Sequence, residues 1–249
     1  SGNYTPRHGV YAVGDTKRGP VNRMRLEPIP NKSGLAPENV TLADALKSAG
    51  YATGIFGKWH LGGPEGAPPA RQGFDVVFDS RQPNPNAKRD EPDDPKGIYS
   101  LTKAAADFME KNKGRPFFAY VAHHAIHTSL EARPASRAKF KAKTPGAQHK
   151  NALYAACLYD LDDGVGLLLK KLADLGLDTN TLVIFTSDNG GTQQSSQEPL
   201  RGSKGGYYEG GIREPFIVRW PGVTKPGSRC DVPIINVDLY PTFLEVAQA

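Results

Sequence analysis

Short apolar runs of strand length alternate with segments of helical spacing along this chain, and this alternation restricts the fold more than any other feature. Four runs are predicted as strands: Tyr51–Phe56, Phe117–Ala122, Leu182–Thr186 and Phe216–Trp220. Strands separated by helical segments build βαβ units, whose strands run mostly parallel. The sequence therefore predicts an α/β fold with a mostly parallel sheet sandwiched by helices.

The predicted helices are marked by their ends. Thr41 and Asp44 have capping-box spacing, and Gly50 ends the helix that follows. The longest apolar stripe stops at Gly176, and Asp238 is the expected N-cap of a terminal helix. The three other predicted helices cover Ser100–Asn112, Tyr154–Leu175 and Asp238–Ala247.

Composition excludes several classes of protein. At 249 residues, 38% hydrophobic and 23% charged, the chain is long enough for one large α/β domain or two smaller ones. Its apolar runs are all shorter than a membrane span, and its start lacks the pattern of a secretion signal. The net charge of +5 is scattered, which argues against a nucleic-acid partner. Cys157 and Cys230 lack the spacing of a metal site, and a disulfide between them is left open.

Two segments depart from the alternating pattern. Arg81–Gly97 is rich in proline and charge, which predicts a long surface loop. Arg133–Lys150 is strongly basic and carries few apolar residues. This basic segment is either a solvated face or a rim that attracts a sulfated polysaccharide.

Polar residues follow the predicted strands where an open α/β sheet binds its ligands, beyond the carboxyl ends. The first strand is followed by Lys58 and His60, the second by His123–His127 and the third by Asp188-Asn189, while Lys204 precedes the fourth. Each taken alone has an ordinary explanation: surface polarity, hydrogen-bonded histidines, a turn or a flexible glycine loop. Together they predict one site at one edge of the sheet.

The candidate residues at the strand ends include ligands for a cation and for an anion. Asp188 and Asn189 offer oxygen ligands suited to Ca²⁺ or Mg²⁺, although two ligands are too few to hold a cation alone. Lys58 and Lys204 can neutralise the oxygens of a tetrahedral oxyanion. An obvious nucleophile is not visible among these residues.

The two remaining candidates are histidines, which exchange protons near neutral pH. His127 is a candidate proton donor to a leaving alkoxide. His60 is a candidate to orient or deprotonate the attacking group.

Four long motifs resemble the type I, formylglycine-dependent sulfatases, arylsulfatase-like members of the alkaline phosphatase superfamily. They are GYATGIFGKWHLG at 50–62, AHHAIHT at 122–128, LVIFTSDNGG at 182–191 and LRGSKGGYYEGGIREPFIVRWPG at 200–222. The motifs occur in the family's order and cover nearly the whole chain. The resemblance implies sulfuric ester hydrolysis.

The resemblance also implies ligands for substrate and metal. Lys58 and Lys204 would hold sulfate oxygens, and Asp188 and Asn189 would bind a divalent cation, usually Ca²⁺. Related phosphatases tend to have histidine after this aspartate, as suits zinc, whereas an amide oxygen favours a hard cation. Asn189 therefore favours a sulfatase over a phosphatase.

The nucleophile implied by the resemblance is a formylglycine hydrate, assisted by His60, with His127 at the leaving-group oxygen. It is expected upstream of residue 1, because Ser1–Gly9 resembles the sequence that follows the family's nucleophile motif. Cys157 and Cys230 lack the proline and arginine of that motif. Residues 1–249 are thus expected to be a truncated large catalytic domain without the C-terminal subdomain, and inactive by itself.

The resemblance implies as substrate a sulfated small molecule or polysaccharide, and a periplasmic or secreted location. Two alternatives remain at this stage. One is a phosphoester or phosphonate hydrolase of the same superfamily, and the other is a non-catalytic glycan-binding pseudoenzyme.

Overall fold

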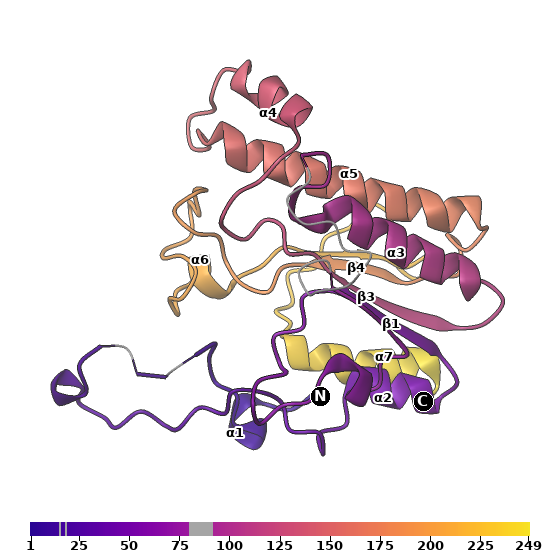
Figure 1. Ribbon diagram of the computed structural model, residues 1–249, viewed down its shortest axis with the longest axis horizontal. Helices are drawn as coiled ribbons and strands as arrows, with labels where there is room; N and C mark the ends of the chain where they lie inside the picture. Colours follow the sequence, from indigo (N-terminus) through magenta and orange to yellow (C-terminus); the bar gives the residue numbers. More distant parts are fainter. Residues whose placement is uncertain (15, 18, 80–91) are drawn as a thin grey trace. The chain divides into compact units, whose positions relative to one another are not determined.

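The computed structural model describes residues 1–14, 16–17, 19–79 and 92–249 (Figure 1). The described chain divides into two compact units, which are described separately. The first comprises Ser1–Asp79, Asp107–Ala122 and Val232–Ala249, and the second comprises Ser80–Ala106 and His123–Asp231. Of the predicted surface loop over 81–97, residues 81–91 lie outside the described residues.

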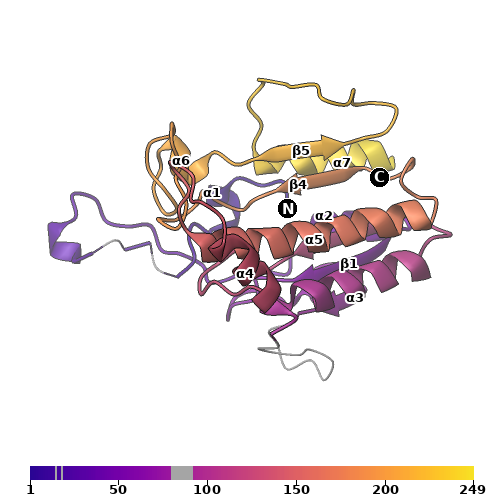
Figure 2. The ribbon, with the colours of Figure 1, turned by 90° about the horizontal axis from the view of Figure 1, so that it is seen from above.

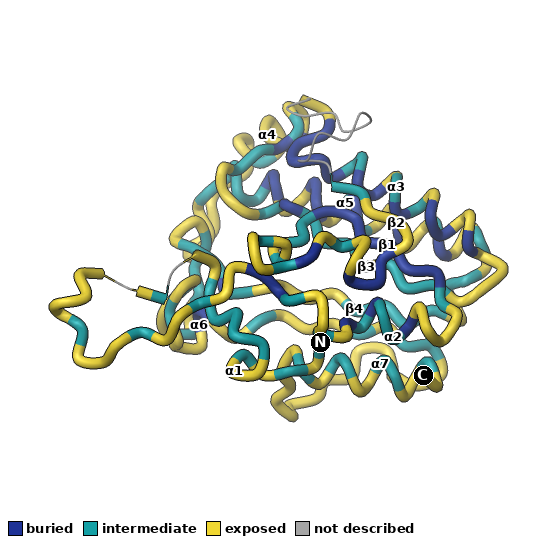
Figure 3. The backbone as a smooth tube through the Cα atoms, turned by 60° about the horizontal axis from the view of Figure 1, so that its bottom comes forward, coloured by how far each residue is buried: buried dark blue, intermediate teal, exposed yellow. Residues whose placement is uncertain are grey.

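A three-stranded parallel sheet forms the centre of the first unit. The strand β1 (Ala52–Gly57) lies between β2 (Val76–Phe78) and β3 (Phe117–Ala122). Every residue of β1 is buried, as expected for a central parallel strand (Figure 3). The two longer strands confirm the sequence prediction. The strand β2 was not predicted, because three residues carry no readable period.

Helix α2 (Leu42–Ser48) precedes β1 and begins at the predicted capping box. The Thr41 side chain accepts a hydrogen bond from the Asp44 backbone N–H, and the Asp44 carboxylate accepts one from the Thr41 N–H. Gly50 follows the helix with φ of +88°, where a side chain would be strained. Both helix ends therefore confirm the prediction.

Helix α7 (Leu239–Ala247) packs against α2 in the same unit. Asp238 precedes it, as predicted, but its side chain makes no capping bond to α7. The carboxylate instead accepts the backbone N–H of Ile235, 2.8 Å away, at the start of the 3₁₀ turn η4 (Asn236–Asp238). Asp238 thus precedes α7 as predicted, but its side chain caps the preceding turn η4 and not α7.

The core of the first unit is largely aromatic. Phe74 contacts the rings of Trp59 and Phe118, with centroids 5.9 and 6.2 Å apart. Phe56 of β1 contacts Phe108, 5.5 Å away. These contacts fix β1 and the segment that leaves it.

Two long helices and a short one dominate the second unit. They are α3 (Ile98–Lys111, whose end belongs to the first unit), α4 (Pro134–Lys141) and α5 (Ala152–Asp174). A Cβ at Gly164 of α5 would lie 2.8 Å from Ile98 and 3.0 Å from Thr102, so glycine allows α3 and α5 to approach closely. The predicted helices α3 and α5 are confirmed. Helix α4 lies within the segment predicted only as basic.

The strands β4 (Val183–Thr186) and β5 (Phe216–Arg219) pair in the second unit (Figure 2). Both were predicted, but they pair antiparallel, with Thr186 opposite Phe216. The end of β4 and the start of β5 therefore lie side by side. The short helix α6 (Glu209–Ile212) belongs to the loop before β5.

The remaining elements are single turns. They are α1 (Thr5–His8), η1 (Val21–Arg23), η2 (Pro69–Arg71) and η3 (Pro95–Gly97). Cys157 and Cys230 are both free thiols, so the disulfide left open by the sequence is absent. Within the described ranges, every helix is too short or too polar to cross a bilayer.

Candidate active site

The end of β1 is built around a glycine that admits no side chain. Gly57 has φ of +111°, and a Cβ there would lie 2.0 Å from the carbonyl oxygen of Ala122 at the end of β3. The next backbone N–H, of Lys58, donates to that same carbonyl at 2.8 Å. The strands β1 and β3 thus end side by side, and Lys58, which is half-buried, leaves the sheet from a fixed position.

Trp59 anchors the segment that carries Lys58 and His60. Its indole N–H donates to the carbonyl of Ala67 at 2.9 Å, and its ring packs edge-on against Phe74. His60 is exposed and has φ of +99°, a conformation that costs a non-glycine residue about 1–3 kcal/mol. The packing around Trp59 therefore maintains a strained backbone at a predicted site residue, as is common at functional sites.

The three histidines after β3 have different environments. His124 is buried, and His123 lies within 3.5 Å of the Thr102 hydroxyl. Burial, with a smaller contribution from His124, lowers the pKa of His123 to about 4, so its ring is neutral at physiological pH. These two side chains are part of the packing of the second unit.

His127 is the exposed member of the histidine segment. Its Nδ1 lies 2.6 Å from the carbonyl oxygen of Thr128. A carbonyl only accepts hydrogen bonds, so this contact assigns a proton to Nδ1 and leaves Nε2 as the atom that exchanges protons. Of the three histidines, His127 thus has the geometry of a proton donor or acceptor.

The loops that carry Asp188, Asn189 and Lys204 are joined directly. The Lys204 backbone N–H donates to the carbonyl of Gly191 at 2.9 Å, and the Gly190 N–H donates to the carbonyl of Gly211 at 3.1 Å. Asp188 and Lys204 are exposed, and Asn189 is half-buried. The antiparallel pairing of β4 with β5 explains this juxtaposition, which was predicted on the basis of a parallel sheet.

The glycines of these loops provide close backbone packing. A Cβ at Gly190 would lie 2.0 Å from the carbonyl oxygen of Gly210, and one at Gly211 would lie 2.4 Å from that of Gly206. Gly190 and Gly211 are therefore packed against neighbouring backbone, whereas a Cβ at Gly205, next to Lys204, would meet nothing within 4 Å.

One further carboxylate, Glu214, was not among the predicted site residues. Continuing the β4–β5 register by two residues puts Glu214 opposite Asp188. Burial and then the Asp188 charge raise the pKa of Glu214, while Ser187 opposes the shift. One Glu214 oxygen, Oε1, is buried without a hydrogen-bond partner among the described residues. Only the strand register could have revealed this pair.

The six predicted site residues are divided between the two units. Lys58 and His60 belong to the first unit, and His127, Asp188, Asn189 and Lys204 belong to the second. Their convergence on one site thus stays a prediction, apart from the joined loops of the second unit. Among the residues that the structure describes, no three His, Cys, Asp or Glu side chains cluster as a metal site.

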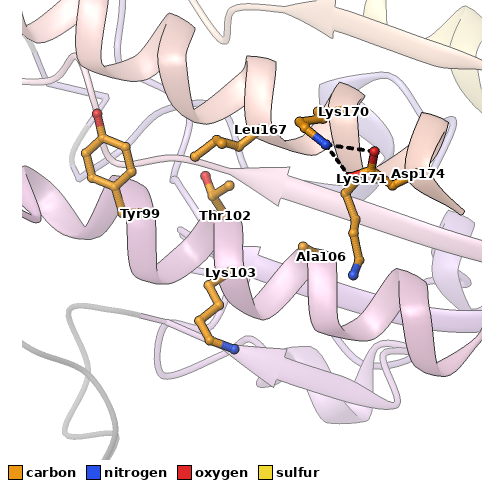
Figure 4. Close-up of a pocket in the computed structure, with 8 residues that line it drawn as sticks. All are labelled: Tyr99, Thr102, Lys103, Ala106, Leu167, Lys170, Lys171 and Asp174. Carbon is orange, nitrogen blue, oxygen red and sulfur yellow. Dashed lines mark hydrogen bonds and ion pairs between the residues drawn. The ribbon is translucent and has the colours of Figure 1, made fainter.

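A pocket of about 360 Å³ lies between α3 and α5 (Figure 4). Ala106 and Leu167 contribute to its apolar lining. The nearby Lys170 ammonium is paired with Asp174 at 2.6 Å. The pocket contains none of the predicted site residues.

Comparison with known proteins identifies the family. The family model described as Sulfatase matches residues 3–249. The chain is 34% identical to arylsulfatase A of Homo sapiens over 261 residues, which covers 88% of this chain and 50% of that protein. It is 31% identical to an arylsulfatase of Hemicentrotus pulcherrimus over 247 residues, covering 85% and 43%. The chain thus spans about half the length of the curated relatives it matches.

Solved structures agree with this comparison. The structure of Ps i-CgsB has a TM-score of 0.78 and 28% identity, covering 100% of this chain and 59% of that one. The same protein in complex with k-i-k-neocarrahexaose has a TM-score of 0.75 and 28% identity, covering 95% and 58%. The chain belongs to the sulfatase family and has its α/β fold.

Proposed function

We propose that this chain provides two substrate-binding lysines and two metal ligands of an enzyme that hydrolyses sulfate esters. The main observation in support is that the loop with Asp188 and Asn189 is hydrogen-bonded to the loop with Lys204. This arrangement brings oxygen ligands for a cation and a positive charge for an oxyanion to one end of the β4–β5 pair. Membership of the sulfatase family supports the same reaction.

A hard divalent cation fits the residues of this end. Asp188 and Asn189 would bind it through a carboxylate and an amide oxygen, the ligands that Ca²⁺ and Mg²⁺ prefer. The strand register puts the Asp188 and Glu214 carboxyl groups opposite each other there, and the Asp188 charge contributes, after burial, to the raised pKa of Glu214. A bound cation would relieve that repulsion. It would supply electrostatic stabilisation of negative charge on the ester.

The lysines and histidines would act on the ester itself. Lys204 and Lys58 would neutralise the sulfate oxygens, on which negative charge is held throughout the reaction. His127 would protonate the departing oxygen from Nε2, since Nδ1 is occupied by the Thr128 carbonyl. His60 would orient the attacking group.

Cys157 is unsuited to be the nucleophile. Its side chain is fully buried, and burial raises the pKa of the thiol, which disfavours the reactive thiolate. A formylglycine hydrate outside these residues is therefore part of the proposal, on the basis of family membership.

We propose a sulfated carbohydrate as substrate and export to the periplasm or exterior as location. The Ps i-CgsB structure with k-i-k-neocarrahexaose supports a carbohydrate ligand. A phosphonate monoester hydrolase also has a similar structure, with a TM-score of 0.62 over 86% of this chain and 59% of that one, but 19% identity supports the fold alone.

The test compares hydrolysis of 4-nitrophenyl sulfate and 4-nitrophenyl phosphate by the complete protein with Ca²⁺. Sulfate should be preferred, and Lys204→Ala should lower kcat/KM for the sulfate by roughly a hundredfold, the usual cost of losing an oxyanion ligand. Lys225→Ala removes another exposed charge, after β5, and should leave the rate unchanged. A phosphate preference would instead identify a phosphoester hydrolase, and equal rates in the two variants would refute the role of Lys204.

A further inference from the structure

We propose that the exposed cations of α4 and of the loop between α4 and α5 form a rim that binds additional sulfate groups of the substrate. The rim consists of Arg137, Lys139, Lys141, Lys143 and Lys150. This inference rests on the proposed sulfate ester hydrolysis and narrows its substrate to a multiply sulfated glycan.

The segment that contains the rim carries positive charges only. Residues 132–151 contain six Lys or Arg and no Asp or Glu. One of the six, Arg133, is committed elsewhere: its Nε lies 3.0 Å from Asp160, and its Nη2 lies 3.0 Å from Asp163. Arg133 belongs to the segment that was predicted as basic, but its contacts with Asp160 and Asp163 make it part of the α4–α5 contact. The five remaining cations are exposed.

Helix α4 carries these charges on a fixed support. The buried Asp160 of α5 accepts hydrogen bonds from the Arg133 backbone N–H and from the Ser136 hydroxyl. Phe140 packs against Tyr159 with ring centroids 5.7 Å apart, and the Lys139 ammonium lies 3.7 Å from the centre of the Tyr159 ring. The start of the rim is therefore anchored to α5.

The end of the rim is attached to the loop beside Lys204. Gln148 donates to the Glu198 carboxylate at 2.9 Å, and Asn151 donates to the Gln194 side chain at 2.5 Å. The same loop, residues 192–198, contains Gln197, whose side-chain oxygen accepts the backbone N–H of Gly191 at 3.2 Å.

Gly191 in turn accepts the backbone N–H of Lys204. A short chain of hydrogen bonds thus connects the rim to the proposed sulfate-binding lysine. Figures 1 and 2 agree, because both show α4 and α6 at the same end of α5.

Spaced, exposed ammonium groups suit an extended polyanion better than a small ester. Each exposed ionic contact contributes little, so several must act together, which requires a ligand with repeated sulfates. A ligand with a single sulfate, held at Lys204, would leave the rim unused.

The test uses a fluorescent dextran sulfate hexasaccharide as the polysulfated probe and 4-nitrophenyl sulfate as the single-sulfate probe. In the complete protein, Lys141→Gln/Lys143→Gln/Lys150→Gln should weaken binding of the hexasaccharide roughly tenfold and reduce its salt dependence. The kcat/KM for 4-nitrophenyl sulfate should not change. The matched control, Lys111→Gln/Lys113→Gln/Lys225→Gln, removes three exposed lysines from other places and should bind like the parent protein.

Equal affinity of the two triple variants for the hexasaccharide would refute the proposed role of the rim. A loss of 4-nitrophenyl sulfate turnover in the rim variant would also overturn it, because the rim would then act on the reaction itself. Failure of the parent protein to hydrolyse 4-nitrophenyl sulfate, with the rim-dependent binding intact, would instead reject the proposed hydrolysis and retain the binding site.

Discussion

Substitution of Asp160 by asparagine should destabilise the second unit, because this buried carboxylate joins α4 to α5. The Asp160 side chain is 0% exposed. It accepts the Arg133 backbone N–H at 2.8 Å, the Arg133 Nε–H at 3.0 Å and the Ser136 hydroxyl at 2.5 Å. Asparagine keeps the volume but replaces one acceptor oxygen by an N–H donor and removes the charge.

The expected cost follows from these contacts. Breaking a buried ion pair by removing one partner costs about 3–5 kcal/mol, because the other charge is left uncompensated. The Arg133 side chain is 29% exposed and keeps Asp163 at 3.0 Å, so water and that carboxylate offset part of the loss. The free energy of unfolding should therefore fall by about 3 kcal/mol, the lower end of this range.

Urea unfolding followed by circular dichroism measures this change, and hydrogen exchange of residues 134–141 reports whether α4 detaches. Asp162→Asn is the matched control, since it removes an exposed carboxylate from the same helix and should change stability by less than about 0.5 kcal/mol. If Asp160→Asn is no less stable than Asp162→Asn, the Asp160 network does not hold α4 in place and the reasoning is wrong.

Two further predictions concern the residues around the ends of β1 and β3. Because the pKa of His123 is about 4 instead of 6.5, the unfolded chain binds a proton between these pH values that the folded chain does not. The stabilisation that comes from burying the neutral His123 ring should thus be complete above pH 6.5. The free energy of unfolding should fall by about 3 kcal/mol as the pH drops to 4. His123→Gln should flatten this part of the pH dependence in urea titrations, and an unchanged slope would contradict the burial argument. Gly57→Ala should cost about 3 kcal/mol, since its Cβ would overlap the Ala122 carbonyl and its φ is +111°. Gly114→Ala, with nothing within 4 Å, is the control, and equal thermal midpoints for the two alanine variants would refute the steric account.

Local sequence determined the elements and the chemistry that they carry. The capping box at Thr41 and Asp44 depends on residues three apart, and the buried strands β1 and β3 on short apolar runs, so both were readable without tertiary contacts. The candidate residues Lys58 and Asp188 were found in the same way, as polar residues directly after such runs. The order of these motifs predicted the sulfatase family, and the family model that matches residues 3–249 confirms it.

Tertiary structure decided which of these residues meet. The antiparallel register of β4 and β5 puts Glu214 opposite Asp188, and no local pattern encodes a pairing between residues 26 positions apart. Arg133 looked like part of a basic surface until its partner Asp160, 27 residues later, became visible. Hydrophobic period and helix caps act over a few residues, whereas carboxylate pairs and buried ion pairs depend on how distant segments pack, which is why only the fold could assign them.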